Sequence, residues 1–297
     1  MSNELNTEHV RRLIALARDE DLGAQGDVTS RLLPPHLLDG QGRWRLVARD
    51  AGRFCGRELL ELLIAELAPQ ISLRWIGPAE PRGDLARGSA VAELSGHVGQ
   101  MLAAERTILN FLQHLSGIAT LTARFVAAVA GTGAKIYDTR KTTPGLRTLE
   151  KYAVRCGGGH THRTGLFDAV LIKDNHLAGI PTNRLAHAVF EMLSRLSTLP
   201  ATPAFVEVEC DGLDQLAELL KVVGIDVILL DNFETDALRE AVRLRDASGL
   251  RGKVELEASG RAGLDTVRRI AETGVERIAV GAITHSAPIL DLGLDAA

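Results

Sequence analysis

Residues 204–231 read AFVEVECDGLDQLAELLKVVGIDVILLD, in which two short aliphatic strands enclose an amphipathic helix. We expect the strands at 204–209 and 226–231 and the helix at 213–222. Val and Ile favour strands, whereas the Leu, Ala and Glu of the middle segment follow the spacing of a helix with one apolar face. A buried strand, a helix and a second buried strand form a parallel βα unit. This segment therefore predicts an α/β fold with parallel strands.

The same alternation continues on both sides of this segment. Further strands are expected at 134–138, 169–173, 253–258 and 277–281, with helices at 145–155, 183–196, 234–247 and 263–273. Repeated βα units indicate either a barrel or a doubly wound sheet. No GxGxxG follows a strand and no Walker A motif occurs, which weakens the dinucleotide-binding and P-loop hypotheses.

The N-terminal part of the chain lacks this alternation. The patterns there predict helices at 8–19 and 57–68 and strands at 43–49 and 89–94. The stretch 101–130 predicts two helices, with an interruption near Ser116-Gly117. We therefore expect a mixed N-terminal domain that is joined to the βα part by helices.

Composition limits the classes of protein to consider. The 297 residues carry a net charge of -4, which argues against a chain-wide surface for nucleic acid or anionic lipid. Hydrophobic residues make up 45% and aromatic residues 4%, and no apolar run approaches the ~18 residues of a membrane span. No secretory signal is visible, and Cys55, Cys156 and Cys210 form no CxxC, which excludes a disulfide framework and a structural zinc site. We expect a cytoplasmic protein.

Polar residues end each of the six expected parallel strands. They are Asp138 to Lys141, Lys173 to His176, Glu209, Asp231-Asn232, Glu257 to Gly260, and Gly281-Ala282. Taken singly, such a residue is usually a solvated charge, a helix cap or a salt-bridge partner. In barrels, however, the carboxyl ends of the strands build the active site. Six polar endings in succession favour a functional site.

The densest group of cations lies at 138–163, DTRKTTPGLRTLEKYAVRCGGGHTHR. Arg side chains suit planar carboxylates, and Lys supplies a point charge. Lys151 and Arg155 lie on the expected helix and are interpreted as solvated. The run Gly157–Gly159 is either a flexible joint or a tight loop that places His162 and Arg163 over the site.

The strand ends together predict a site with three parts. Its cationic half contains Arg140, Lys141, His162, Arg163 and Lys173, and its acidic half contains Glu209 and Asp231. Ser259-Gly260 and Gly281-Ala282 follow the last two strands, where barrels commonly bind phosphate. A planar polyanion would meet the cations, and a sugar phosphate, with or without Mg²⁺, would meet the other two parts.

Several motifs at these positions resemble the quinolinate phosphoribosyltransferase family. They are DTRKTTPGLR at 138–147, GGGHTHR at 157–163, LIKDNH at 171–176, FVEVECD at 205–211, ILLDN at 228–232, EASG at 257–260 and VGAITHS at 280–286. GDVTS at 26–30 and AAERTILNFLQHLSGIAT at 103–120 resemble the same family. The motifs follow the family's order over nearly the whole chain.

The resemblance implies a fold and an activity. The expected fold is an N-terminal α/β sandwich domain at 1–110, joined by the C-terminal tail at 286–297, and an open α/β barrel with parallel strands at 111–285. The family's barrel has seven strands, of which six are evident here. The implied reaction transfers phosphoribosyl from phosphoribosyl pyrophosphate to quinolinate with decarboxylation, giving nicotinate mononucleotide, pyrophosphate and CO₂ in de novo NAD biosynthesis. The implied assembly is a homodimer, or a hexamer, with shared active sites.

The resemblance also implies roles for individual residues. Catalytic roles fall to Lys141, Lys173, Glu209 and Asp231. Quinolinate would be bound by Arg106, donated by the partner subunit, and by Arg140, His162, Arg163 and Lys173. Phosphoribosyl pyrophosphate would be bound by Lys141, Glu209, Asp231, Ser259, Gly260 and Gly281. Glu209 and Asp231 would also hold Mg²⁺, directly or indirectly, and no organic cofactor, nucleic acid or membrane is expected.

Two positions depart from the family's pattern, and three other functions remain open. Thr161 stands where Asn is usual and Arg261 where Gly is usual, which bears on fine specificity. One alternative is a related phosphoribosyltransferase that acts on another pyridine or aromatic carboxylate. A second is a sugar-phosphate aldolase or isomerase with Lys173 as Schiff-base lysine. The third is a non-catalytic anion receptor.

Overall fold

The computed structural model describes residue 5 and residues 7–76, 83–260 and 262–297. These residues form two compact units. Unit one contains Met1–Ala123, Thr142–Gly158 and Ile283–Ala297, and unit two contains Arg124–Lys141 and Gly159–Ala282. No helix in the described ranges is long and apolar enough to cross a membrane.

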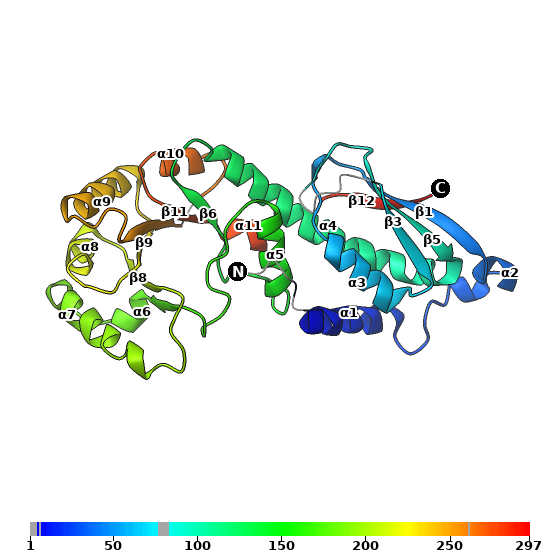
Figure 1. Cartoon of the computed structure of the whole chain (residues 1–297), viewed down its shortest axis with the longest axis horizontal. Helices are drawn as coiled ribbons and strands as arrows, with labels where there is room; N and C mark the ends of the chain where they lie inside the picture. Colours follow the sequence, from blue (N-terminus) through cyan, green and yellow to red (C-terminus); the bar gives the residue numbers. More distant parts are fainter. Residues whose placement is uncertain (1–4, 6, 77–82, 261) are drawn as a thin grey trace. The chain divides into compact units, whose positions relative to one another are not determined.

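Unit one is built on a four-stranded antiparallel sheet in the order β12-β1-β5-β3. Its strands are β1 (Gln41–Ala48), β3 (Ile71–Trp75), β5 (Ala90–His97) and β12 (Leu292–Ala296), and β2 (Gly52–Arg53) pairs with β4 (Asp84–Leu85). The helical elements are α1 (Thr7–Leu22), η1 (Ser30–Leu32), α2 (Pro35–Leu38), α3 (Arg57–Leu67), α4 (Val98–Ala128), α5 (Arg147–Cys156) and α11 (Ala282–His285). Figure 1 shows α3 and α4 lying along this sheet. Trp44 and Leu46 of β1 and Leu60 of α3 are buried, so the core lies between the two layers.

The stretch that was expected to form two helices is one continuous helix, α4. The expected break at Ser116-Gly117 is wrong, because both residues serve contacts with other segments. Ser116 Oγ accepts a hydrogen bond from the Cys55 N–H at 3.0 Å. A Cβ on Gly117 would lie 2.0 Å from the Pro288 carbonyl oxygen, so this glycine allows a close backbone approach.

Two further differences from expectation lie in unit one. Strands β2, β3, β4 and β12 were not expected, and β12 joins the sheet from the far end of the chain by pairing with β1. Lys151 was interpreted as solvated, and this is wrong, since it is only 2% exposed. Helix α5 buries Leu149, Tyr152 and Val154 as well, so its burial extends around much of the helix rather than along one stripe.

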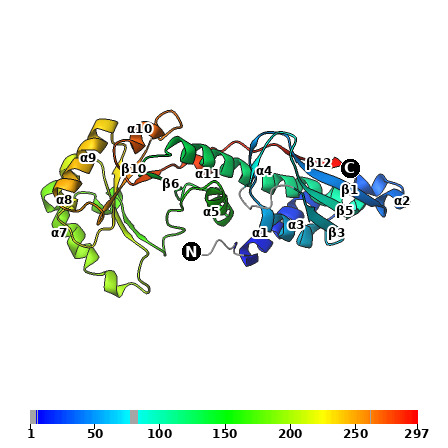
Figure 2. The ribbon, with the colours of Figure 1, turned by 45° about the horizontal axis from the view of Figure 1, so that its top comes forward.

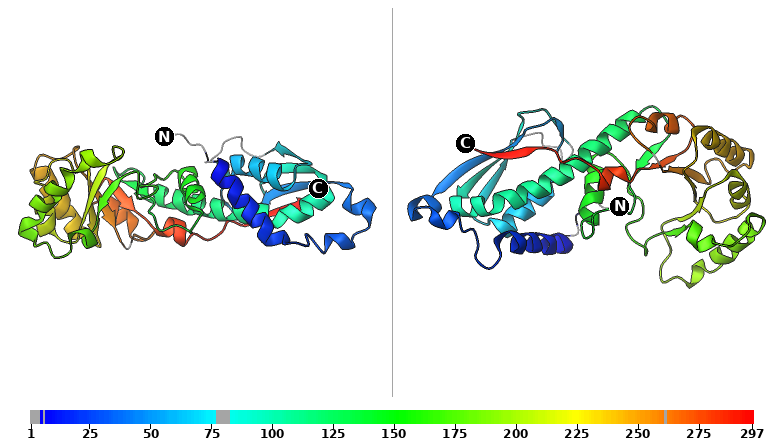
Figure 3. Two further views of the ribbon diagram at one scale, coloured as in Figure 1. Left: turned by 90° about the horizontal axis from the view of Figure 1, so that it is seen from below. Right: turned by 180° about the vertical axis from the view of Figure 1, so that it is seen from behind.

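Unit two is built on a six-stranded parallel sheet in the order β6-β11-β10-β9-β8-β7. The strands are β6 (Lys135–Tyr137), β7 (Val170–Ile172), β8 (Val206–Cys210), β9 (Val227–Asp231), β10 (Glu255–Ser259) and β11 (Arg277–Ala279). The helical elements are α6 (Asp174–Leu177), α7 (Thr182–Leu193), η2 (Leu196–Thr198), α8 (Leu213–Leu219), α9 (Thr235–Ala247) and α10 (Val267–Ala271). Figures 1, 2 and 3 agree in placing α7, α8 and α9 on the outer face of this sheet.

The strand order is that of a barrel that stays open between β6 and β7. The first strand in the chain, β6, pairs with the last, β11, as it would in a closed barrel. Strands β6 and β7 form the two edges of the sheet, and a single parallel bridge, Tyr137 to His160, lies on the outer side of β6. The six strands expected from the sequence are all present, and the α/β fold with an open parallel barrel is confirmed.

The close approach at Gly117 gives a first prediction. Alanine is favoured over glycine inside a helix by ~1 kcal/mol, so Gly117→Ala would by itself stabilise the folded state by this amount. The new methyl group would, however, meet a backbone oxygen that cannot rotate away, and overpacking of this kind costs about 1–3 kcal/mol. Because a 2.0 Å approach lies far inside contact distance, the upper part of this range, about 2–3 kcal/mol, applies. After the gain of ~1 kcal/mol, we expect Gly117→Ala to lower the free energy of unfolding by about 1–2 kcal/mol in urea titration.

Gly99→Ala is the matched control for this substitution. It lies in the same helix, and its new methyl group would meet the ends of the Leu38 and His97 side chains rather than backbone atoms. This variant is expected to match or exceed the stability of the wild type. Equal stability of Gly117→Ala and the wild type would contradict this prediction. It would mean that the backbone around Pro288 moves away from the new methyl group at little cost in free energy.

Candidate active site

Three of the predicted cations line one pocket of unit two. Arg140, Arg163 and Lys173 border a cavity of about 780 Å³, which we call the cationic pocket. The rest of its lining is largely apolar and includes Phe167 and Met192. Arg140 follows β6, Arg163 lies in the loop between α5 and β7, and Lys173 follows β7. The opening in the barrel therefore brings these three side chains together.

The two guanidinium groups of the cationic pocket have no carboxylate partner among the residues the structure describes. Arg163 is 8% exposed, and burial together with the nearby Arg140 lowers the pKa of its guanidinium below the ordinary value. Nε of Arg140 is buried and has no hydrogen-bond partner within the described ranges. A buried charge without a partner costs several kcal/mol. An anionic ligand would remove this cost at both positions, so the pocket suits a compound with two acidic groups.

The predicted acidic pair lines a second, smaller cavity. Glu209 and Asp231 border a space of about 280 Å³, the acidic pocket, together with Asp174 and Asp211, which sequence reasoning did not assign to the site. Lys173 Nζ lies 2.6 Å from Glu209 Oε2, so one ion pair joins the cationic pocket to the acidic pocket. Carboxylate oxygens are the ligands that Mg²⁺ prefers, and the donor set here fits that ion.

The ends of β9 and β10 form a tight backbone arrangement beside Asp231. Asn232 has a φ of 57°, which is unusual for a residue other than glycine, and its N–H donates to the Ser259 carbonyl at 2.9 Å. Gly260 has a φ of 89°, and a Cβ there would lie 2.2 Å from Asn232 Oδ1. Only glycine fits at position 260. Gly281 follows β11 and directly precedes α11.

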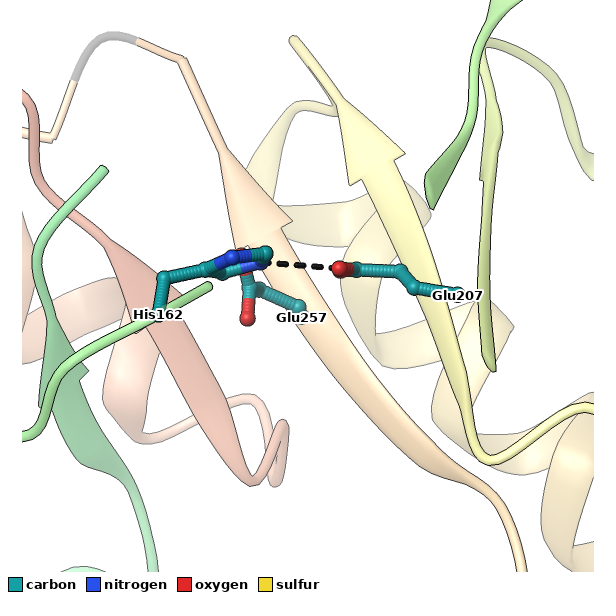
Figure 4. Close-up of side chains that lie close together, drawn as sticks. All are labelled: His162, Glu207 and Glu257. Carbon is teal, nitrogen blue, oxygen red and sulfur yellow. Dashed lines mark ion pairs between the residues drawn. The ribbon is translucent and has the colours of Figure 1, made fainter. Parts of the chain in front are cut away.

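His162 does not line either pocket and instead points into a buried cluster. Its Nε2 lies 2.8 Å from Glu207 Oε2 and 3.6 Å from Glu257 Oε1 (Figure 4). Glu207 and Glu257 are 0% exposed and come from β8 and β10. Burial and the negative charge of Glu207 raise the pKa of the Glu257 carboxyl well above its ordinary value. In the folded chain Glu257 therefore keeps its proton to a higher pH than a free glutamate does.

The loop that carries His162 is fixed by hydrogen bonds. The backbone N–H of His162 donates to Asp138 Oδ1 at 2.7 Å, and the N–H of Arg163 donates to His162 Nδ1 at 2.8 Å. The N–H of His160 donates to the Ile136 carbonyl at 2.8 Å. Of the two hypotheses for the glycine run 157–159, the tight loop is supported at His162 and Arg163, which are both buried.

The remaining predicted residues lie elsewhere. Lys141 is exposed and outside the linings of both pockets. Arg106 is exposed on α4 in unit one. Thr161 is half-buried beside His162, and Arg261 lies outside the described residues.

Sequence reasoning placed Glu207 and Glu257 on strands but did not connect them with His162. The available signal was a carboxylate in the middle of an otherwise aliphatic strand, VEVEC in β8 and ELEAS in β10. Acidic residues are almost never fully buried unless they have partners. A buried partner for each could therefore have been expected, although not which one.

The proton on Glu257 gives a prediction for stability against pH. Its pKa is higher in the folded chain than the 4.5 of the free group, so above pH 4.5 the folded state binds a proton that the unfolded state has lost. The wild type therefore loses stability as the pH rises from about 4.5, by up to ~1.4 kcal/mol per pH unit. Glu257→Gln removes this loss. We expect the variant to exceed the wild type in urea midpoint at pH 8 and the advantage to shrink towards pH 4.5; an advantage that does not change with pH would contradict the assignment.

Comparison with known proteins identifies the family of this chain. Models of the quinolinate phosphoribosyl transferase N-terminal and C-terminal domains match residues 27–116 and 118–295. The nicotinate-nucleotide pyrophosphorylase (carboxylating) of Mycobacterium leprae is 40% identical over 99% of this chain and 100% of its own length. The structure of the nicotinate-nucleotide pyrophosphorylase from Francisella tularensis is 38% identical, with a TM-score of 0.86 over 99% of this chain and 98% of that one. The enzyme of the same name from Ehrlichia chaffeensis is 36% identical, with a TM-score of 0.84 over 96% and 98% of the two chains. This chain belongs to the quinolinate phosphoribosyl transferase family.

Proposed function

We propose that this protein transfers the phosphoribosyl group of phosphoribosyl pyrophosphate to quinolinate and releases pyrophosphate and CO₂. The product is nicotinate mononucleotide, a precursor of NAD. The observation that carries the proposal is a pair of arginines, the buried Arg163 and the half-buried Arg140, that have no carboxylate partner among the described residues and line a pocket joined to an acidic pocket. The names of the full-length relatives support the same reaction.

Quinolinate carries two carboxylates on neighbouring carbons of a pyridine ring. In the cationic pocket, the two guanidinium groups and Lys173 would pair with these carboxylates, and the apolar lining would contact the ring. Several fixed cations orient the ring more strictly than one would, so the ring nitrogen is directed towards the ribose. A ligand with a single acidic group would leave one arginine unpaired.

The acidic pocket faces the other half of the reaction. The ring nitrogen attacks the anomeric carbon of the ribose while pyrophosphate leaves, and the transition state resembles an oxocarbenium ion. Glu209 and Asp231 would stabilise this positive charge. They would also hold Mg²⁺, which when bound neutralises charge on the pyrophosphate. Ser259, Gly260 and Gly281 would contact the ribose phosphate through their backbone, and the exposed Lys141 would pair with the pyrophosphate.

Decarboxylation follows from the first step without an organic cofactor. Once the nitrogen carries ribose, the ring is a pyridinium ion, and its positive charge stabilises the carbanion left at C2 when the 2-carboxylate leaves as CO₂. A proton from water then adds to C2 and gives nicotinate mononucleotide. The 3-carboxylate stays paired with an arginine. Lys173 is suited to this binding role rather than to Schiff-base chemistry, because an ammonium group in an ion pair with Glu209 is protonated and not nucleophilic.

We further propose that the enzyme works as a homodimer in the cytoplasm. Arg106 is exposed on α4 and would complete the partner's quinolinate site. Leu166 and Phe167, on the lining of the cationic pocket, are 73% and 84% exposed, which leaves apolar surface for a second copy to cover. The net charge of -4 supports small-molecule partners rather than nucleic acid or membranes.

The proposed reaction is tested directly. Incubated with quinolinate, phosphoribosyl pyrophosphate and Mg²⁺, the protein should release pyrophosphate and CO₂ in equal amounts. Arg140→Ala and Arg163→Ala should each weaken quinolinate binding by about 2–4 kcal/mol, because a charge-assisted pair is lost from a partly desolvated pocket. Calorimetric titration with each substrate measures this.

Binding of phosphoribosyl pyrophosphate is the internal control for these variants and should change less. Equal losses for both substrates would contradict the assignment of the cationic pocket. Absence of turnover by the wild type, with nicotinate or another pyridine acid accepted in place of quinolinate, would replace the proposed substrate.

Sharing of the site between subunits is tested by mixing two inactive variants. Arg106→Ala and Lys173→Ala are combined and allowed to exchange subunits. If Arg106 reaches the neighbouring site, each mixed dimer has one site with both substitutions and one with neither, so part of the activity returns. If Arg106 acts within its own subunit, every site keeps one substitution. No recovery, with exchange shown by mass spectrometry, would contradict the shared site.

A further inference from the structure

We propose that Asn232 is a positioning residue for Asp231, and that its side-chain amide fixes the direction of this carboxylate in the acidic pocket. This role rests on the proposed function of the acidic pocket. Asn232 directly follows β9, and three features meet at this position. They are a left-handed backbone, a hydrogen bond between neighbouring side chains and a close approach to Gly260.

The backbone of Asn232 adopts a conformation that is unfavourable for a residue with a side chain. Its φ of 57° is the one positive value at a residue other than glycine among the described residues. Asparagine tolerates this region better than most residues, because its short polar side chain can form local hydrogen bonds. Glycine would adopt the same conformation at lower cost. The side chain of Asn232 therefore supplies something that glycine could not.

The amide of Asn232 is bonded to the carboxylate of the preceding residue. Nδ2 of Asn232 donates to Oδ2 of Asp231 at 2.6 Å. Within the described ranges, the Asp231 carboxylate has no other hydrogen-bond or ion-pair partner. A carboxylate has two oxygens that accept hydrogen bonds, so this bond restricts its rotation and leaves Oδ1 for a ligand. Asp231 lines the acidic pocket, where that ligand would lie.

The end of β10 (Glu255–Ser259) limits the movement of the amide. The backbone N–H of Asn232 donates to the Ser259 carbonyl at 2.9 Å. A Cβ on Gly260 would lie 2.2 Å from Oδ1 of Asn232 and 2.9 Å from its Cγ, so the amide packs against the backbone of this glycine. The absence of a side chain at Gly260 thus makes room for the amide of Asn232 as well as allowing its own φ of 89°.

The direction of the Asp231 carboxylate matters for the proposed reaction. A group that stabilises the positive charge of the transition state is effective only if it is oriented before the charge develops. A carboxylate that rotates freely would have to be ordered during each turnover. The amide of Asn232 removes this requirement, and because it acts through Asp231 its effect should be on kcat rather than on the binding of quinolinate.

The alternative is that Asn232 only shapes the turn, and Asn232→Gly separates the two roles. Glycine keeps the left-handed backbone and the N–H that is donated to Ser259, but it removes the amide. We expect the urea midpoint to equal or exceed that of the wild type, while kcat falls roughly 10- to 100-fold and the quinolinate KM stays within about threefold. An unchanged kcat would overturn the proposal.

Two further variants separate the loss of the amide from a loss of stability. Asn232→Ala lacks the amide and does not tolerate the backbone conformation, so its urea midpoint should fall below that of the wild type, with kcat as low as in Asn232→Gly. In an Asp231→Asn background, Asn232→Gly should lower kcat by less than about threefold more, because the charge that it positions is gone. A kcat that follows the urea midpoint across the variants, or losses that multiply in the double variant, would overturn the proposal.

A measurement that does not depend on activity completes the test. In the ¹H–¹⁵N spectrum, the side-chain amide of Asn232 is identified by its disappearance in Asn232→Gly. One of its two protons should move upfield in Asp231→Ala, which removes the acceptor, and should stay in place in the matched variant Glu209→Gln. An unchanged signal in Asp231→Ala would overturn the proposal. If the shift is observed but the wild type does not turn over quinolinate, then the proposed function fails and the bond between amide and carboxylate stands.

Discussion

The barrel of unit two is not closed by backbone hydrogen bonds between β6 and β7, and the site depends on how that opening is filled. The loop after α5 enters this opening. His160 in the loop forms one parallel bridge with Tyr137, and Nε2 of His162 lies 2.8 Å from Oε2 of Glu207 on β8. A side-chain contact thus spans the break where a strand pair would otherwise lie. The opening leaves room for Arg163 and Arg140 on the side of the pocket. A closed barrel of the same strands would pack this space with apolar side chains.

The distribution of charge follows from the same geometry. Cations gather where the opening admits a ligand, and carboxylates gather at the ends of β8 and β9. The two groups would neutralise each other if they met freely, yet among the residues that the structure describes Lys173 and Glu209 are the one pair that joins the two pockets. Within the described ranges Arg140 and Arg163 form no salt bridge, although Glu207 and Asp168 are near enough to act on the charge of Arg163. The fold thereby maintains an arrangement that is unfavourable without ligand and favourable with it.

The sequence was sufficient for the parts of the fold that depend on local pattern. Largely aliphatic runs of five or six residues identified all six strands of the barrel, because a strand buried on both faces consists mostly of apolar residues. The sequence was insufficient where the surroundings of a residue are set by a segment far away in the chain. Gly117 suggested a helix break, but the contact that requires glycine comes from Pro288, far away in the chain. Lys151 had the pattern of a solvated residue, and its burial depends on elements that no local window contains. The pocket residues Arg140, Arg163 and Lys173 were predictable because strand ends meet in any barrel.

Glu207 and Glu209 show why position along a strand matters as much as residue type. They are two residues apart on β8, so their side chains leave the same face of the sheet. Glu207 lies one step deeper, where no solvent reaches it, and meets the imidazole of His162. Glu209 lies at the strand end, pairs with Lys173 and lines the acidic pocket. About 7 Å of strand rise separates a carboxylate in the buried cluster from one that lines the acidic pocket. The alternation of period two gives the face of each residue, but the depth of each residue in the barrel decides which of the two carboxylates lines a pocket.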